Sequence, residues 1–171
     1  ITVLSGAYKI PNIWGETTAT FTNTVWVDAY RGAGRPEGAF VVERLLDLGA
    51  RKMDMDPIDL RMKNFFQPDE FPYQTPVAFL YDSGNYPAMT EKLVELSEYK
   101  KMRQKQEQAR RDGKLVGIGV ATCIESSGAA PAAVAGSLGA VTGFWEHASI
   151  RAHPTAQVSV HVGSHAHGQG H

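Results

Sequence analysis

Apolar and polar side chains alternate along residues 15–27 in the manner of a β-strand. Threonine and β-branched residues, which favour strands, make up most of this stretch. Thr17, Ala19, Phe21, Asn23 and Val25 form the more apolar set, and Thr18, Thr20, Thr22 and Thr24 form the other. Because side chains alternate between the two faces of a strand, the pattern predicts a strand with one more apolar face.

A helix is predicted next, after a turn over residues 31–38 that contains glycine and arginine. Pro36 suits the first turn of a helix, where its missing N–H leaves no hydrogen bond unmade. Apolar side chains then recur at helical spacing at Val41, Leu45 and Leu48. We therefore expect these three side chains to form the apolar stripe of that helix.

Two further helices are predicted in the middle of the chain. Asp56 suits a helix N-cap and Pro57 the first helical position, so a short helix is expected to run to about Phe65. The pattern over residues 88–111 predicts the longest helix, and Gly113 is a suitable terminator. The last part of this helix is almost wholly polar. A solvated face explains its charge run better than an anion site does, because acidic and amide side chains separate the bases.

The C-terminal part of the chain predicts strands. Residues 115–125 are a strand candidate that two glycines interrupt. Residues 145–151 and 157–162 are predicted to pair as a hairpin, because Pro154 suits the second position of the turn between them. Residues 126–143 are rich in alanine and glycine, and we expect either a tightly packed loop or a close approach of the backbone there.

This order mixes helices and strands without regular β–α–β alternation. With 43% hydrophobic and 20% charged residues among 171, it predicts a folded chain of the α+β class. A formal net charge of −1 argues against a general nucleic-acid binder and against a polybasic membrane-surface protein. The single cysteine, Cys123, excludes an intrachain disulfide and a Cys-only metal or iron–sulfur site. No apolar run is long enough to predict a membrane span.

Residues 29–38 are the first candidate for chemistry. Their glycines stand at positions 32, 34 and 38, whereas the dinucleotide-binding fingerprint needs the third glycine at position 37, which is Glu37. The remaining features are two glycines that let backbone approach a ligand, donors on Arg31 and Arg35, and a helix N-terminus. A glycine-rich turn that merely begins a helix is the alternative.

Histidines gather near the end of the sequence. His161, His165, His167 and His171 have the donor chemistry of a zinc or copper site. Glycines surround them, and no carboxylate is near in sequence. The other interpretation is therefore a loop that holds a ligand through backbone N–H groups and the amide of Gln169.

Cys123 and Glu125 lie at the end of the strand candidate. In that apolar setting we expect Cys123 to be a small core residue. Glu125 is expected to face solvent or an arginine, and a buried general base is the alternative.

Several short stretches together carry a resemblance to known proteins. They are Tyr8–Ile13, Thr22–Val25, Asp28–Glu37, Asp56–Pro57, Arg61–Phe65, Tyr81–Gly84, Gly117–Gly119, Gly163–Ser164 and His167–His171. With these stretches the sequence resembles the large, molybdenum-binding subunit of the xanthine dehydrogenase and aerobic carbon monoxide dehydrogenase family, in its second, carbon-monoxide-dehydrogenase-like form. The stretches occur in the same order as in that family and cover nearly the whole chain.

The resemblance implies a piece of the molybdopterin-binding domains of a longer molybdenum hydroxylase subunit. Residues 1–112 would belong to a first domain and residues 113–171 to a second, both incomplete. The implied cofactor is molybdopterin cytosine dinucleotide with molybdenum, which the protein holds by hydrogen bonds rather than by metal ligands. The motifs assign Ala29, Tyr30, Arg31, Gly32, Gly168, Gln169, Gly170 and His171 to cofactor binding, and Ala33 and Gly34 to the substrate pocket.

The implied reaction oxidises a small aldehyde, N-heterocycle or related substrate with water as the oxygen source. Electrons would leave through an iron–sulfur small subunit and an FAD-binding medium subunit, in the cytoplasm. The family's catalytic glutamate is absent from the sequence, so no catalytic residue is assigned and the chain alone is expected to be inactive. The alternatives are a non-catalytic truncated fragment and a small zinc- or copper-binding protein.

Two positions in the loop depart from particular members of the family. Carbon monoxide dehydrogenases carry a cysteine there to hold copper, whereas Arg31 is followed by Gly32, Ala33 and Gly34. Xanthine dehydrogenases place an aromatic residue where Ala33 stands. The resemblance therefore predicts neither copper-dependent oxidation of carbon monoxide nor a purine substrate. Trp26 stands where proline is common, and nothing in the sequence explains that change.

Overall fold

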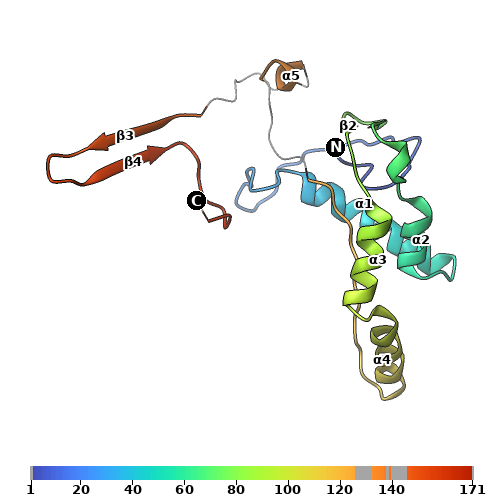
Figure 1. The fold of residues 1–171 in the computed structure, drawn as a ribbon. Coiled ribbons are helices and arrows are strands. Elements are labelled where there is room, and N and C mark those ends of the chain that lie inside the picture. Colours follow the sequence, from blue (N-terminus) through green and yellow to red (C-terminus); the bar gives the residue numbers. More distant parts are fainter. Residues whose placement is uncertain (1, 126–131, 138, 140–145, 171) are drawn as a thin grey trace. The chain divides into compact units, whose positions relative to one another are not determined.

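The computed structural model describes residues 2–125, 132–137, 139 and 146–170. The chain divides into two compact units, residues 1–125 and 126–171 (Figure 1). In the first unit lie α1 (Arg35–Lys52), α2 (Pro57–Asn64), a 3₁₀ turn (Pro68–Glu70), β1 (Tyr73–Gln74), β2 (Leu80–Tyr81), α3 (Tyr86–Leu96) and α4 (Tyr99–Arg111). The second unit holds α5 (Ala132–Ser137), β3 (Ala148–Ala152) and β4 (Val158–Val162). This mixture of helices and antiparallel pairs confirms the α+β class.

Helices α1 and α2 begin where the sequence predicts. Pro36 is in the first turn of α1. The Asp56 carboxylate accepts the backbone N–H of Ile58 at 2.8 Å and so caps α2, which begins at Pro57. These local signals are sufficient because a cap and a proline satisfy or remove backbone donors that a helix N-terminus leaves unpaired.

The core of the first unit lies between the N-terminal segment, α1 and the end of α2. Ala7, Tyr8, Val42 and Phe65 are buried together, and the rings of Tyr8 and Phe65 stack with their centroids 5.2 Å apart. The backbone N–H of Lys9 donates to the carbonyl of Asn64 at 2.8 Å, which fixes the N-terminal segment against α2. The neighbouring Phe66 ring contacts the rings of Phe71, Tyr73, Tyr81 and Tyr86.

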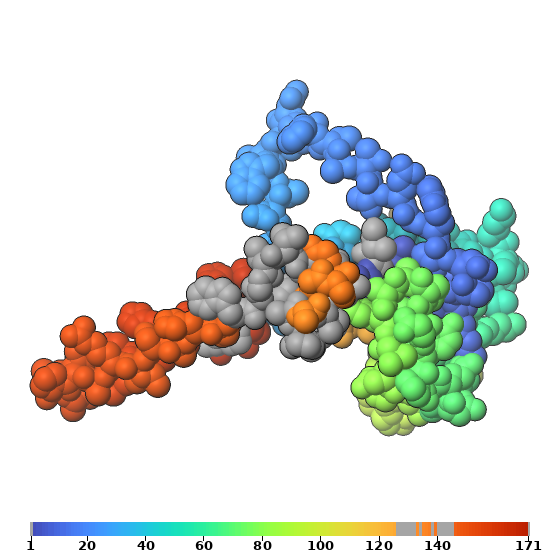
Figure 2. All heavy atoms as spheres, turned by 90° about the horizontal axis from the view of Figure 1, so that it is seen from above, coloured from blue at the N-terminus to red at the C-terminus, as the bar shows by residue number. Residues whose placement is uncertain are grey.

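The predicted strand over residues 15–27 is wrong. The structure assigns no strand there, and Figure 2 shows this blue segment arching away from the rest of residues 1–125. Phe21 and Val25 are among its exposed apolar side chains. A strand is defined by hydrogen bonds to a neighbouring strand, and no described segment pairs with this one. The alternating pattern alone cannot supply that partner.

The apolar stripe expected on α1 also differs from the buried face. Val42, Glu43 and Ala50 are the buried residues of this helix. Val41, Leu45 and Leu48 are exposed. The residues that meet the core are therefore offset from the predicted stripe, because the N-terminal segment and α2 cover the other side of the helix.

Residues 88–111 do not form one helix. The break falls at Ser97 and Glu98, where Glu98 adopts the left-handed conformation with φ 49° and ψ 42°. The next residue, Tyr99, is buried, and its hydroxyl lies 3.1 and 3.2 Å from the two carboxylate oxygens of Asp56. This contact between Tyr99 and Asp56 lies directly after the break between α3 and α4. Helical spacing in the sequence cannot predict such a tertiary contact. The helix α4 ends before Gly113, which has φ 73° and confirms the predicted terminator.

The strand predicted over residues 115–125 is absent as well. Side-chain bonds fix this segment instead, including one from the Gln106 amide to the carbonyl of Val116 at 2.9 Å. Cys123 is exposed, so its expected place in the core is wrong. The neighbouring Ile124 packs against the core while Cys123 does not, because the segment presents only part of its side chains to α1 and Tyr8.

The C-terminal hairpin confirms the prediction within the second unit. Strands β3 and β4 pair antiparallel around the turn His153–Ala156, and the backbone N–H of His153 donates to the carbonyl of Gln157 at 2.8 Å. Ala156 has φ 62°, the left-handed position that glycine usually fills in such a loop. One face of the pair is wholly apolar and carries Ala148, Ile150, Ala152, Val158, Val160 and Val162.

Two expectations for the second unit fall partly outside the described residues. The predicted first strand began at Trp145, which is not described, and β3 begins at Ala148. The packed loop expected over residues 126–143 contains the described helix α5, so it is not a loop throughout. Among the described helices, none is both long and apolar enough to cross a membrane.

Candidate functional site

The loop over residues 28–34 leads directly into α1 and has an unusual backbone. Gly32, Ala33 and Gly34 have consecutive positive φ angles of 102°, 43° and 89°. The N–H of Ala33 donates to the carbonyl of Tyr30 at 2.8 Å, which closes the turn. Only glycine adopts such conformations freely, so a run of small residues is what this backbone path requires.

Gly32 is required for a second reason. A β-carbon at this position would lie 2.6 Å from Cγ of Pro36, well inside van der Waals contact. At Gly34 a β-carbon would meet nothing within 4 Å. Thus Gly32 lets the turn close onto the first turn of α1, whereas Gly34 leaves open space beside the loop.

All the site residues predicted in this loop except Gly32 border one hollow of about 360 Å³. It is lined by Asp28, Ala29, Tyr30, Arg31, Ala33, Gly34, Pro36 and Glu37. The structure therefore brings together three of the proposed cofactor residues, Ala29, Tyr30 and Arg31, with both proposed substrate residues. The arrangement offers guanidinium and backbone donors beside a helix N-terminus, which suits an anionic or oxo-rich ligand.

Arg35 connects this loop to a distant part of the first unit. Its Nε donates to the carbonyl of Gly32 at 2.9 Å, and its backbone N–H donates to the same oxygen at 3.1 Å. Its Nη1 lies 3.0 Å from Oε1 of Glu125. The expectation that Glu125 faces an arginine is confirmed, and its exposed, paired carboxylate is not a buried base.

The C-terminal loop is described as far as Gly170. Gly168 and Gly170 have φ angles of 92° and 83°. The side-chain carbonyl of Gln169 accepts the N–H of His167 at 2.5 Å, and its amide donates to the carbonyl of His165 at 3.3 Å. The Gln169 amide therefore orders its own turn. His171, the last residue assigned to this site, lies outside the described residues.

The histidines of the alternative metal site are only partly described. The rings of His165 and His167 lie edge to face with centroids 4.6 Å apart. His161 sits on β4 opposite Ser149. No group of three His, Cys, Asp or Glu side chains among the described residues has a metal-binding arrangement.

Sequence reasoning missed a buried polar network in the first unit. Arg61, fully buried, donates through Nε to Oε2 of Glu43 at 2.9 Å and lies 3.0 Å from Oδ1 of Asp47 through Nη2. The Tyr8 hydroxyl donates to Oε1 of Glu43 at 2.5 Å and lies 2.5 Å from the hydroxyl of Thr122. In the sequence, this network shows only as an arginine and a glutamate on two successive predicted helices, and neither residue stands out there.

Burial and pairing explain the electrostatics of this network. Burial, followed by the hydrogen bond to Glu43, raises the pKa of Tyr8 above its ordinary value. Burial acts to lower the pKa of Arg61, but the hydrogen bond and charge of Glu43 outweigh it and raise that pKa. Both groups therefore stay protonated at neutral pH. We assign the network a structural role, because its arginine is enclosed and satisfied by carboxylates and backbone carbonyls.

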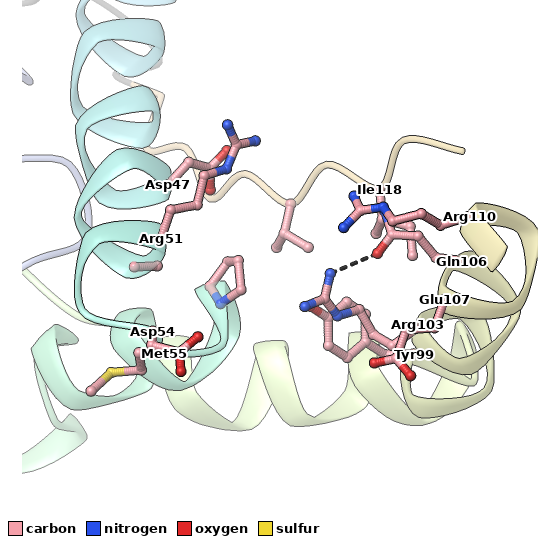
Figure 3. Close-up of a pocket in the computed structure, with 13 residues that line it drawn as sticks. Asp47, Arg51, Asp54, Met55, Tyr99, Arg103, Gln106, Glu107, Arg110 and Ile118 are labelled. Carbon is pink, nitrogen blue, oxygen red and sulfur yellow. Dashed lines mark hydrogen bonds between the residues drawn. The ribbon is translucent and has the colours of Figure 1, made fainter. Parts of the chain in front are cut away.

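A larger groove of about 620 Å³ lies between α1, α4 and residues 118–120. Figure 3 shows Arg51, Arg103 and Arg110 around this space, with Arg103 donating to Gln106 at 2.7 Å. Three carboxylates, on Asp47, Asp54 and Glu107, balance the three arginines. With no net charge in its lining, the groove lacks the character of an anion site, in agreement with the solvated face expected for α4.

Tyr99 at the edge of this groove has a shifted titration. Burial, and then the charge and hydrogen bond of Asp56, raise the pKa of Tyr99 to about 12. The hydroxyl remains protonated at neutral pH and bridges α4 to the cap of α2. Like the Arg61 network, this contact holds helices together.

Comparison with known families now defines the class of protein. Two family models, each described as a molybdopterin cofactor-binding domain, match residues 1–65 and 92–171. The first match includes the loop at residues 28–34, and the second includes the C-terminal loop. The chain is thus built from parts of molybdopterin cofactor-binding domains.

Individual relatives agree over the whole chain. The carbon monoxide dehydrogenase large chain of Hydrogenophaga pseudoflava is 35% identical over 99% of this chain and 21% of its own length. The nicotine 6-hydroxylase large subunit of Paenarthrobacter nicotinovorans is 31% identical over 98% of this chain and 20% of its own length. The crystal structure of quinoline 2-oxidoreductase from Pseudomonas putida 86 is similar with a TM-score of 0.76, at 32% identity over 93% of this chain and 20% of that one.

The chain belongs to the family of molybdenum-binding large subunits that contains carbon monoxide dehydrogenases and xanthine dehydrogenases. The resemblance inferred from the motifs is confirmed at this level. The chain spans about a fifth of the length of the curated relatives it matches.

Proposed function

We propose that this chain is the part of a molybdenum hydroxylase large subunit in which residues 29–34 contact the molybdopterin cofactor. One observation carries the proposal. Ala29, Tyr30, Arg31, Ala33 and Gly34 line a single hollow. The family resemblance assigned these positions, and a single loop presents all five of them to the same space, as a binding loop requires.

The residues of the hollow fit a hydrogen-bonded cofactor. The Arg31 guanidinium provides donors for oxo or phosphate groups, and the glycines at positions 32 and 34 place no side chain over the left-handed turn. The helix α1 adds the positive end of its dipole at Arg35. Arg31 would hold and orient the ligand, and Gly34, which has open space beside it, would let the backbone approach the ligand closely.

We further propose a small aldehyde or N-heterocycle as substrate. When bound, the molybdenum cofactor supplies a two-electron oxidation that uses water as the oxygen source. The Ala33 methyl group leaves room at the hollow but gives no ring for stacking a purine, and no thiol follows Arg31 to hold copper. Nicotine and quinoline, named in two similar proteins, are N-heterocycles.

The remaining features of the proposed enzyme follow from the family. The cofactor would be the cytosine dinucleotide form, with Gly168, Gln169, Gly170 and His171 at its pterin and phosphates. We also propose a domain boundary between residues 112 and 113, which would separate the two loops along the chain; residues 113–125 nevertheless pack with the first compact unit. Iron–sulfur and FAD subunits would carry electrons away in the cytoplasm. We assign no catalytic residue in this chain.

The test is molybdenum retention by the full-length subunit in its complex. We expect Gly32→Ala to lower molybdenum content about tenfold or more, because it combines a disfavoured φ with a clash at Pro36. The matched control is Gly113→Ala, which has a similar φ of 73° but meets nothing within 4 Å and lies outside the loop. Arg31→Ala should lower the content as well, against Arg110→Ala as its control. Equal retention by both members of each pair would overturn the proposal.

A further inference from the structure

The ion pair between Arg35 and Glu125 differs from the exposed ion pairs of the first unit that lie within one helix turn. Lys92 and Glu95, for example, pair within one helix turn, where each side chain reaches only its own helix. Arg35 and Glu125 are far apart in sequence and join the start of α1 to the end of the first unit. Such a contact restrains tertiary structure rather than a local turn.

Arg35 transmits this restraint to the loop at residues 28–34. Its backbone N–H and its Nε both donate to the carbonyl of Gly32, at 3.1 and 2.9 Å. The guanidinium group is planar, so an arginine whose Nη1 is held by a carboxylate presents its Nε in a fixed direction. Glu125 thus orients the donor that holds the carbonyl of Gly32.

The loop needs an external restraint because its own conformation is disfavoured. Ala33 adopts φ 43° between two glycines, and glycines lose the most conformational freedom on ordering. The preceding residues, 15–27, form no described strand that could support the loop from its other side.

The backbone next to Glu125 is held by the core of the first unit. Three residues before it, the hydroxyl of Thr122 is buried and lies 3.1 Å from Oε1 of Glu43, to which it donates. The intervening Ile124 packs against the core around Tyr8. The backbone that carries Glu125 is therefore fixed to the buried network, and the loop is linked to the core through Glu125 and Arg35.

We infer that Glu125 is a positioning residue for the cofactor loop and that it acts through Arg35. The inference rests on the proposed function for the ligand that the loop holds. Glu125 is not among the residues that line the hollow, and its role is to keep the carbonyl of Gly32 in place.

The test compares Glu125→Ala with Glu95→Ala in the full-length subunit within its complex. We expect Glu125→Ala to speed loss of molybdenum on dialysis by about two- to fivefold, the range that one partly exposed ion pair provides. Hydrogen exchange of the backbone amides at residues 29–34 should speed by a similar factor. Glu95→Ala removes a more exposed ion pair within a single helix, with side chains 60% and 70% exposed against 31% and 55%, and should change neither quantity.

A double-mutant cycle separates positioning from a general structural effect. Glu125→Gln keeps an acceptor for Arg35 and should restore most of the slow exchange. In an Arg35→Ala background, Glu125→Ala should have no further effect, because its partner is gone. The inference would be overturned if Glu125→Ala had its full effect in the Arg35→Ala background. Unchanged amide exchange in the Glu125→Ala single variant would overturn it as well.

The two proposals fail in different ways. If the wild-type subunit holds no molybdenum in a host that makes the cofactor, the proposed function fails, while the exchange measurements still decide the role of Glu125. If Gly32→Ala loses molybdenum but Glu125→Ala behaves as wild type in both measurements, the function stands and the positioning role is refuted.

Discussion

Replacement of Arg61 by methionine removes the cation from the largely buried network that the described side chains of Tyr8, Glu43, Asp47, Arg61 and Thr122 form. Arg61 is 0% exposed, and the side chain of Glu43, its main partner, is only 9% exposed. The guanidinium also donates to the backbone carbonyls of Pro57 and Glu43 at 3.0 and 3.2 Å. The variant fills much of the same volume but leaves these acceptors without their donor.

The expected cost comes from the partner left behind. At the 2.8 Å separation of Arg61 Nη2 and Glu43 Oε2, the attraction is about 6 kcal/mol at an effective dielectric constant of about 20. Desolvation of the two charges offsets much of that attraction, so the intact pair adds little over an apolar pair. Removing only the arginine costs about 3–5 kcal/mol, because a buried carboxylate then has no countercharge at that site.

Hydrogen exchange of α2 amides in the full-length subunit measures this cost locally. Arg61→Met should lower the opening free energy of the amides of Leu60 and Phe65 by about 3–5 kcal/mol. Arg44→Met, on the exposed side of α1, should change it by less than about 0.5 kcal/mol. Adding Glu43→Gln to Arg61→Met should recover part of the loss. A loss below about 1 kcal/mol for Arg61→Met, or no recovery in the double variant, would refute the reasoning.

Two further predictions concern the helix junction and the hairpin. Ala156→Gly should slow amide exchange in β3 and β4 about fivefold, because glycine relieves the left-handed φ of 62°. The control Ala152→Gly, within the strand, should speed the exchange. Faster exchange in Ala156→Gly than in Ala152→Gly would contradict the turn geometry. Because the pKa of Tyr99 is raised from 10.0 to about 12, its stabilising contribution is complete below pH 10 and is lost as the pH rises toward 12. The difference between tyrosinate absorbance titrations of wild type and Tyr99→Phe should therefore have a midpoint near pH 12, and a midpoint near 10 would argue against its burial beside Asp56.

Local signals predicted the starts and ends of elements well. Asp56 and Pro57 begin α2, Gly113 follows α4, and Pro154 lies in the hairpin turn. Each of these residues acts on backbone groups within a few positions of itself, so its effect is contained in the sequence nearby. The loop at residues 29–34 was found in the same way, because glycines at 32 and 34 signal a backbone path that other residues resist.

Features that depend on distant partners were not predictable. The strand expected at residues 15–27 requires a neighbour to pair with, and the break at Glu98 accompanies the contact between Tyr99 and Asp56. The pairing of Arg61 with Glu43 joins residues 18 positions apart on two helices, where each alone resembles an ordinary surface charge. Alternation and spacing describe the faces of an element, but packing decides which face is covered.

The most direct test of the central claim is the content of the purified wild-type full-length subunit, expressed in a host that makes the pterin cofactor. Elemental analysis and acid release of the nucleotide should give molybdenum and cytidine monophosphate in equal amounts, close to one of each per subunit. Zinc or copper without molybdenum would contradict the account and favour the histidines at positions 161, 165, 167 and 171 as the functional group.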